Sequence, residues 1–166
     1  MGMRGYLLSF SAMLVGAATV GYFYTQHMVT PLNRPLPSLP QNVVEVGNEQ
    51  LGSTLLVEVA DTQKRWEKGL TGRDSLPLHQ GMLYRFPQTM DGTWSAQGYK
   101  FSVSVALLDA QGKILRIFDL DSCLSTECPS VQARTAYRGA LEVNRGWFKE
   151  NGIKVGDAVT LRLKSY

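Results

Sequence analysis

Histidine and cysteine are scarce in this chain, which contains two of each among 166 residues. His27 follows closely on an apolar N-terminal segment, so the rest of the chain offers only His79, Cys123 and Cys128 as nitrogen or sulfur ligands. A structural zinc site needs about four such ligands. The sequence therefore predicts neither a metal site nor a bound cofactor.

Charge is also sparse, since Asp, Glu, Lys and Arg together make up 19% of the residues and the formal net charge is only +3. No stripe of basic residues interleaved with aromatic residues occurs, although such a stripe is typical of nucleic-acid-binding proteins. We therefore expect no nucleic acid partner.

One segment, residues 6–24 (YLLSFSAMLVGAATVGYFY), has no charge at all. As a helix it would extend roughly 28 Å at ~1.5 Å per residue, close to the ~30 Å hydrocarbon core of a bilayer. We expect it to insert into the lipid bilayer as an uncleaved signal-anchor, because the apolar run continues through an aromatic cluster at 22–24 that suits the membrane interface. Arg4 precedes it and the next arginine or lysine is Arg34, which favours a cytoplasmic N-terminus and a periplasmic or extracellular domain.

A cleaved signal peptide is the alternative interpretation of this segment. Arg4 would be its positive region, residues 7–15 its apolar region and residues 16–18 (GAA) its cleavage site, and the protein would then be secreted. A buried core helix of a soluble protein is a third interpretation, which the length and N-terminal position of the segment disfavour. The first two interpretations both export the rest of the chain.

A proline-rich segment follows, with prolines at 31, 35, 37 and 40. These favour an extended, semi-rigid spacer, and an ordinary linker fits equally well. We therefore divide the chain into a signal-anchor or transmembrane segment (1–28), a Pro-rich linker (29–42) and a β-rich extracytoplasmic domain (43–166). The domain is long enough to bury a core without extensive cross-linking.

Short runs of β-forming residues separated by turn signals dominate the domain. We expect a short helix at 63–70, capped by Asp61 or Thr62, and a short helix or turn at 144–151. Strands are expected at 55–60, 82–86, 101–108, 113–120, 137–143 and 158–164, with a hairpin turn at 109–112. This pattern predicts a mostly β fold, a small antiparallel β-sandwich or barrel with one or two short helices, preceded by an N-terminal transmembrane helix.

Motifs along the domain occur in an order that is typical of a known family. They are ADT at 60–62, KGLTGR at 68–73, LP at 76–77, GMLYRF at 81–86, LLDAQGKI at 107–114, ALEVNRGWF at 140–148 and GIKVGD at 152–157. The ordered set resembles the domain of unknown function 192 (DUF192) family over nearly all of residues 55–164. The resemblance implies a compact β-rich domain, often exported, and no established reaction.

One block departs from the family pattern, which reads roughly WMKNTLIPLDIAFLD. Residues 94–109 read WSAQGYKFSVSVALLD, so the Met-Lys-Asn-Thr core is missing and Ser104 stands where the family has Asp. A hydroxyl cannot replace an ionised carboxylate in acid–base or metal chemistry. If this block forms a binding site in the family, the chain is a divergent member that functions in binding or assembly. The alternative is that the block has a structural role throughout the family.

The two cysteines, Cys123 and Cys128, lie in a loop rich in Ser, Thr and Pro. Outside the cytoplasm we expect them to be joined, and the family resemblance, which often includes a cysteine pair near here, implies a structural bridge. A redox couple is the alternative. It is disfavoured because redox pairs are usually Cys-x-x-Cys at the start of a helix.

Five residues are candidates for a binding site: Asp61, Arg73, Trp94, Ser104 and Glu142. Asp61 is either a site carboxylate or a helix cap. Glu142 either forms an ion pair with Arg73 or lies in solvent at a strand end. Trp94, like Trp66 and Trp147, either belongs to an aromatic platform for a sugar or peptide or packs in the core.

These observations favour a membrane-anchored extracytoplasmic binding or assembly module with an envelope protein as partner and no established reaction. The alternative is a small envelope hydrolase that acts on a glycan or peptide through His79 with Asp61 or Glu142, although no Gly-x-Ser-x-Gly motif is present. A thiol–disulfide protein is a third hypothesis. Convergence of Asp61, His79, Ser104 and Glu142 in one cleft would favour the hydrolase, and their dispersal would favour the binding module.

Overall fold

The computed structural model describes residues 42–48 and 52–162, which belong to a single unit, Leu39–Tyr166. The predicted membrane segment and nearly all of the predicted linker lie outside the described residues. Among the described helices, none has the length and apolar character that a membrane crossing requires.

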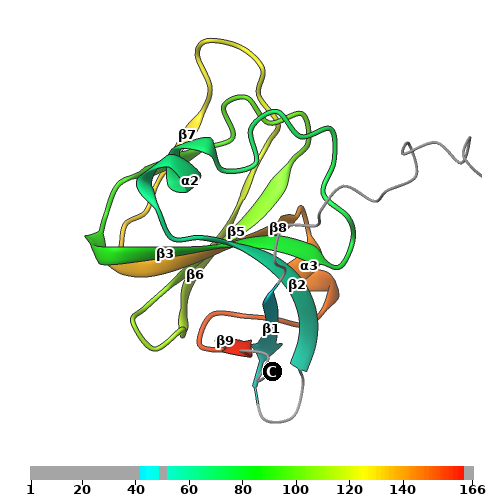
Figure 1. Ribbon diagram of the computed structural model, residues 1–166, viewed down its shortest axis with the longest axis vertical. Helices are drawn as coiled ribbons and strands as arrows, with labels where there is room; N and C mark the ends of the chain where they lie inside the picture. Colours follow the sequence, from blue (N-terminus) through cyan, green and yellow to red (C-terminus); the bar gives the residue numbers. More distant parts are fainter. Residues whose placement is uncertain (1–41, 49–51, 163–166) are drawn as a thin grey trace, which may run out of the picture. The chain divides into compact units, whose positions relative to one another are not determined.

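The described chain contains one seven-stranded sheet in the order β6-β5-β8-β3-β2-β1-β9, and a separate two-stranded sheet pairs β4 with β7. The strands are β1 (Asn42–Gly47), β2 (Gly52–Ala60), β3 (Gln80–Met90), β4 (Thr93–Ser95), β5 (Val103–Leu108), β6 (Ile114–Leu120), β7 (Ser130–Gln132), β8 (Tyr137–Asn144) and β9 (Ala158–Arg162). The helices are α2 (Gln63–Lys68) and α3 (Trp147–Glu150). In Figure 1, α2 and β7 lie at one end of the curled sheet and β1 and β9 at the other.

The predicted mostly β fold with two short helices is confirmed, but the sheet is a curled half-barrel and not a sandwich of two stacked sheets. All neighbouring strands of the large sheet are antiparallel except β2 and β3, which are parallel. The chain between β2 and β3 contains α2, as a parallel connection requires a crossover. The two outer strands, β6 and β9, approach at one end of the sheet, where a bridge pairs Lys113 with Ala158.

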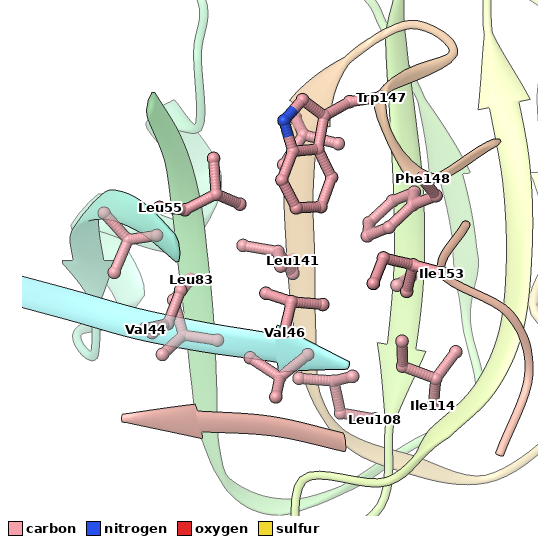
Figure 2. Packing of buried hydrophobic residues seen from close by; sticks show 14 residues of the cluster. Val44, Val46, Leu55, Leu83, Leu108, Ile114, Leu141, Trp147, Phe148 and Ile153 are labelled. Carbon is pink, nitrogen blue, oxygen red and sulfur yellow. The ribbon is translucent and has the colours of Figure 1, made fainter. Parts of the chain in front are cut away.

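Both faces of the central strands are buried, which explains why the residues of β5 are apolar except for Ser104. One face carries an aliphatic core, to which α3 adds Trp147 and Phe148 (Figure 2). Its other buried members are Val44, Val46, Leu55, Val57, Leu83, Ala106, Leu108, Ile114, Leu141, Val143, Ile153 and Val159. We call this surface the aliphatic face.

The opposite face, which we call the aromatic face, gathers a second cluster. Alternate residues of β3 and β8 reach it, because successive side chains of a strand point to opposite sides. Met82 and Tyr84 of β3 and Ala140 of β8 lie in this cluster, and Trp66, Phe86 and Trp94 pack against it.

Several element boundaries differ from the prediction. The strand predicted at 82–86 begins at Gln80 and continues to Met90, and three strands were not predicted: β1, which directly follows the Pro-rich segment, and the three-residue strands β4 and β7. The predicted side-chain cap is also wrong. Thr62 occupies the N-cap position of α2 without a side-chain hydrogen bond, and Asp61 accepts a 2.9 Å hydrogen bond from Arg65.

Candidate functional site

A cleft of about 500 Å³ opens on the aromatic face, between α2, the two-stranded sheet and the central strands. Its walls are aromatic: Trp66, Tyr84, Phe86, Trp94, Tyr99 and Tyr137 all line it, and Glu142 contributes a carboxyl group. The remaining lining residues are Glu67, Lys68, Thr71, Met90, Thr93, Ser95 and Gln97. The cleft is thus concave and combines aromatic walls with polar side chains, the two kinds of lining found in small-molecule sites.

The rings contact one another in a closed circuit. Tyr84 and Trp94 have centroids 5.3 Å apart and planes at 88°, and Phe86 and Tyr137 have centroids 5.8 Å apart at 76°. Tyr84 also stacks with Phe86, and the Trp94 indole donates a 3.0 Å hydrogen bond to the Tyr137 hydroxyl. Each of these four rings therefore packs against two others of the circuit, which restricts its motion.

Glu142 lies beneath these rings with no solvent exposure. Its Oε2 accepts hydrogen bonds from the hydroxyls of Tyr84 at 2.7 Å and Tyr99 at 3.1 Å, and its Oε1 has only a longer 3.3 Å contact with Tyr99. Burial raises the pKa of Glu142 to about 7, and the two tyrosine hydrogen bonds lower it in part. The carboxyl group thus titrates in the physiological range and has unused acceptor capacity at Oε1.

The two tyrosine hydroxyls are themselves held by the chain that follows α2. The Tyr99 hydroxyl accepts a 3.1 Å hydrogen bond from the backbone N–H of Leu70. At Gly69, where φ is +46°, an added Cβ would lie 2.5 Å from the Tyr99 hydroxyl and 2.7 Å from that of Tyr84. Glycine therefore lets the end of α2 approach the carboxyl group closely enough to fix both donors.

The predicted ion pair between Glu142 and Arg73 is wrong, as is the predicted exposure of Glu142. Arg73 instead donates two hydrogen bonds to Glu58, at 2.6 and 2.7 Å, and this pairing lowers the pKa of Glu58. Arg73 and Asp61 line a different groove, of about 640 Å³, on the other side of α2. Of the five candidate binding residues, the structure brings only Trp94 and Glu142 into the aromatic cleft.

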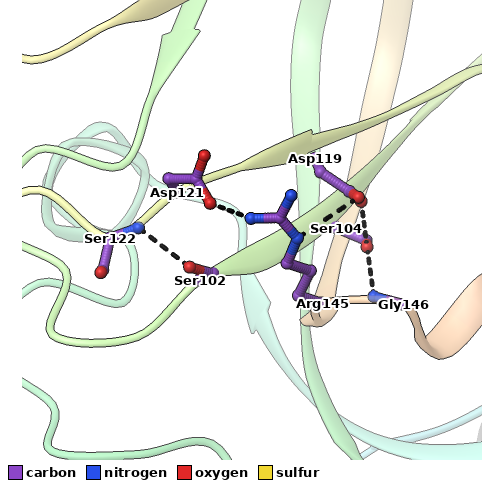
Figure 3. Close-up of polar contacts among 7 residues, drawn as sticks. All are labelled: Ser102, Ser104, Asp119, Asp121, Ser122, Arg145 and Gly146. Carbon is purple, nitrogen blue, oxygen red and sulfur yellow. Dashed lines mark hydrogen bonds and ion pairs between the residues drawn. The ribbon is translucent and has the colours of Figure 1, made fainter.

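Ser104 lies on the opposite face of the sheet from Glu142. In the β5–β8 ladder Ser104 pairs with Val143 and Val105 pairs with Glu142, and neighbouring positions of a strand face opposite sides. The Ser104 hydroxyl donates to Asp119 at 2.5 Å and accepts from the backbone N–H of Gly146 at 2.9 Å. Figure 3 shows this polar network, which also contains Ser102, Asp121, Ser122 and Arg145.

The residues proposed for a hydrolase do not converge. Asp61 follows the end of β2 and His79 precedes the start of β3, while the parallel ladder pairs Leu56 with Gln80 and Ala60 with Tyr84. Asp61 and His79 therefore lie at opposite ends of the paired stretch, and His79 is exposed, away from the buried carboxyl of Glu142. Across residues 42–48 and 52–162, no three His, Cys, Asp or Glu side chains are placed to hold a metal ion.

The predicted disulfide between Cys123 and Cys128 is present. It closes a loop that is hydrogen-bonded to the segment bearing Tyr99, because Gly98 donates its N–H to the carbonyl oxygen of Cys123 at 2.7 Å. A side-chain hydrogen bond from Gln97 to the carbonyl oxygen of Thr126 adds to this contact. The cross-link thus braces one wall of the aromatic cleft, a structural role.

Comparisons with known proteins agree with this architecture. A candidate transcription regulator from Sinorhizobium meliloti has a similar structure, with a TM-score of 0.67, 22% identity and coverage of 76% of this chain and 98% of its own. A protein of unknown function from Novosphingobium aromaticivorans gives a TM-score of 0.67 at 21% identity, with coverage of 80% and 94%. At these identities the likeness concerns the fold alone, and no curated protein matches the sequence. The family model for DUF192, an uncharacterized ACR, matches residues 43–161, and the chain therefore belongs to the DUF192 family.

Proposed function

We propose that the chain is a membrane-anchored extracytoplasmic binding module whose DUF192 domain holds a small ligand in the aromatic cleft. The observation that carries the proposal is the cleft itself, in which rigid rings surround the buried carboxyl group of Glu142. Its volume of about 500 Å³ lies within the range of small-molecule sites, roughly 300–1,000 Å³.

The contacts inside the cleft support binding more than catalysis. Glu142 is hydrogen-bonded to two tyrosines whose own pKa values are raised by burial and by the nearby carboxyl group. These phenols stay protonated and act as donors. Glu142 has a pKa in the range of a general base, but its hydrogen-bonding contacts are these two phenols. Among the described residues of the cleft it therefore has no activated nucleophile beside it, and the arrangement favours orientation of a ligand.

Two features support export of the domain. The uncharged run at 6–24 has the length of a membrane span, and the Cys123–Cys128 disulfide is typical of oxidising compartments outside the cytoplasm. Fractionation of cells that express the full chain, compared with a variant lacking residues 1–28, tests this part. We expect the full chain in the membrane fraction. We expect its domain to be cleaved by added protease only after the outer layer of the cell envelope has been permeabilised.

The cleft is tested by NMR of the full chain in mild detergent with a panel of neutral saccharides, amines and amino acids. The three tryptophans provide three indole N–H signals. We expect a ligand to shift the signals of Trp66 and Trp94, which line the cleft, and to leave that of Trp147 on the aliphatic face unchanged. Equal movement of all three signals, or of none across the panel, would contradict the proposal.

An envelope protein partner remains a prediction from the sequence. Crosslinking of the full chain in intact membranes, followed by purification, tests it. We expect a stoichiometric envelope protein in the crosslinked product, and recovery of the chain alone would contradict an assembly role.

A further inference from the structure

We propose that the ligand of the aromatic cleft is an organic cation, whose methylated or quaternary ammonium group is held by the rings of Tyr84, Phe86, Trp94 and Tyr137 next to Glu142. This inference rests on the proposed binding function of the cleft and names the class of its ligand. Three independent features of the site support it: the arrangement of the rings, the missing counter-charge and the balance of charges at the entrance.

The four rings all line the cleft and contact one another in turn. Around the circuit of Tyr84, Trp94, Tyr137 and Phe86, neighbouring centroids lie 5.3 to 6.2 Å apart and two of the four contacts are nearly perpendicular. A sugar ring stacks on a single aromatic face, whereas an ammonium group gains from nearness to several rings at once, because each face carries the negative lobe of the ring quadrupole. A cleft lined by four rings therefore favours a cation over a sugar.

Glu142 has no cationic partner among the described residues. Its only hydrogen-bonding contacts are the hydroxyls of Tyr84 and Tyr99, and Arg73, the arginine whose charge reaches those tyrosines, is bound to Glu58. Buried carboxylates in proteins are usually paired with a cation. A ligand cation would supply the missing charge. The tyrosine hydroxyls that donate to the carboxylate would also become more electron-rich, which strengthens the attraction of their rings for a cation.

The other charged groups around the site do not neutralise the negative charge of Glu142. Glu67 and Lys68 of α2 both line the cleft and offset each other, and Asp91 adds a negative charge near Tyr137. An anionic ligand would come close to the negative charges of Glu142, Glu67 and Asp91. Lys68 is the one positively charged side chain among the described residues that line the cleft. The cleft therefore disfavours anions, and protonation of Glu142 at acidic pH should weaken cation binding.

The proposal is tested with choline and its uncharged isostere, 3,3-dimethylbutan-1-ol, added to the full chain at pH 8 and at pH 5.5. The two probes have the same shape and differ in charge. At pH 8 we expect choline to bind on the order of tenfold more tightly than the isostere, with shifts confined to the indole signals of Trp66 and Trp94. At pH 5.5, where Glu142 is protonated, we expect this preference to shrink to about twofold or less.

Two variants separate the role of Glu142 from that of net charge. In Glu142→Gln we expect the preference for choline at pH 8 to fall to its wild-type value at pH 5.5 and to become independent of pH. Glu150→Gln removes the same charge from an exposed residue of α3 on the aliphatic side, and we expect it to behave as the wild type does.

The outcomes distinguish the ligand class from the binding function. Equal affinity for the two probes at pH 8, or an unchanged preference in Glu142→Gln, would overturn the assignment of a cation. If a neutral member of the panel then shifted the signals of Trp66 and Trp94, the cleft would remain a binding site for another class of ligand. If nothing shifted these signals, both the ligand class and the binding function would be wrong.

Discussion

Leu141 and Glu142 are neighbours in β8, yet their side chains enter opposite faces of one sheet. Leu141 packs among aliphatic side chains and the aromatic residues of α3. Glu142 lies among tyrosines beside a cleft of about 500 Å³. Both residues are fully buried, so burial alone does not distinguish a residue that stabilises the fold from one that belongs to a site.

The difference between the faces lies in what burial costs. On the aliphatic face the buried hydrophobic side chains gain from leaving water. On the aromatic face a carboxyl group has been desolvated, at a cost that the two tyrosine hydrogen bonds offset only in part. A buried carboxyl group that lowers the stability of the fold and lies beside a cleft is typical of a functional site.

The largest effect is expected on the aliphatic face. Leu141→Ala should lower the free energy of unfolding by about 2–5 kcal/mol, because it removes a fully buried side chain and leaves a cavity. Urea denaturation measures this. Leu124→Ala is the matched control, since Leu124 is 70% exposed and its truncation should change stability by less than about 0.5 kcal/mol. A similar loss of stability in both variants would contradict the role of Leu141 as a buried residue of the core.

On the aromatic face, Glu142→Gln should stabilise the domain at high pH. The folded pKa of about 7 lies above the ordinary glutamate pKa of 4.5, so the unfolded chain releases this proton first as pH rises. Stability from this group is complete below about pH 4.5, declines between there and pH 7, and is then lower by about 3 kcal/mol. The measurement is the difference in unfolding free energy between wild type and Glu142→Gln at pH 4.5 and 8. A difference that does not grow with pH would contradict the assigned pKa.

Removal of the disulfide tests whether the aromatic cleft depends on the loop that the disulfide closes. Cys123→Ser combined with Cys128→Ser should lower the free energy of unfolding by about 2 kcal/mol, because the cross-link closes a short loop. A reductant should produce the same loss in the wild type and no further loss in the variant. If the indole signal of Trp147 moved more than that of Trp94, the loop would support the aliphatic face instead.

The smallest effect on stability is expected at Gly72. Gly69→Ala and Gly72→Ala both place a side chain at positive φ. Gly72→Ala should cost about 1 kcal/mol, and Gly69→Ala should cost more because its Cβ would lie 2.5 Å from the Tyr99 hydroxyl. Only at Gly69 would the added carbon meet the tyrosine hydroxyls, since nothing lies within 4 Å of it at Gly72. We therefore expect ligand binding to weaken in Gly69→Ala alone, measured by the same indole titration. Equal loss of binding in both variants would show that strain in the loop, and not contact with the tyrosines, is responsible.

The main elements of the fold could be predicted because their signals are local. The turn at 109–112 has a glycine at positive φ and joins β5 to β6 as expected, and β5, which is apolar except for Ser104, is buried on both sides. The strands β4 and β7, each of three residues, were missed because so short a run has no measurable alternation. The parallel pairing of β2 with β3 depends on long-range packing that no local pattern encodes.

The site was predicted only in part. Glu142 was chosen as a carboxylate near the end of a predicted strand, but its partners could not be found, because Tyr84 and Tyr99 come from segments 58 and 43 residues away. Ser104 was chosen for its position in a family motif, and its face of the sheet follows from the register of β5 against β8. A carboxylate between Leu141 and Val143 was the one available signal that this strand carries more than packing.

The contact between the outer strands β6 and β9 affects whether copies of this domain can associate through the edges of their sheets. Residues near the turn after β5 and residues before β9 exchange backbone hydrogen bonds, from Ile114 to Asp157, from Gly156 to Ile114 and from Val159 to Gly112. At Gly112 an added Cβ would lie 2.4 Å from the carbonyl oxygen of Val159, so the approach depends on glycine. The ends of both border strands are thereby occupied within one molecule, which protects the domain against polymerisation through edge-to-edge strand addition.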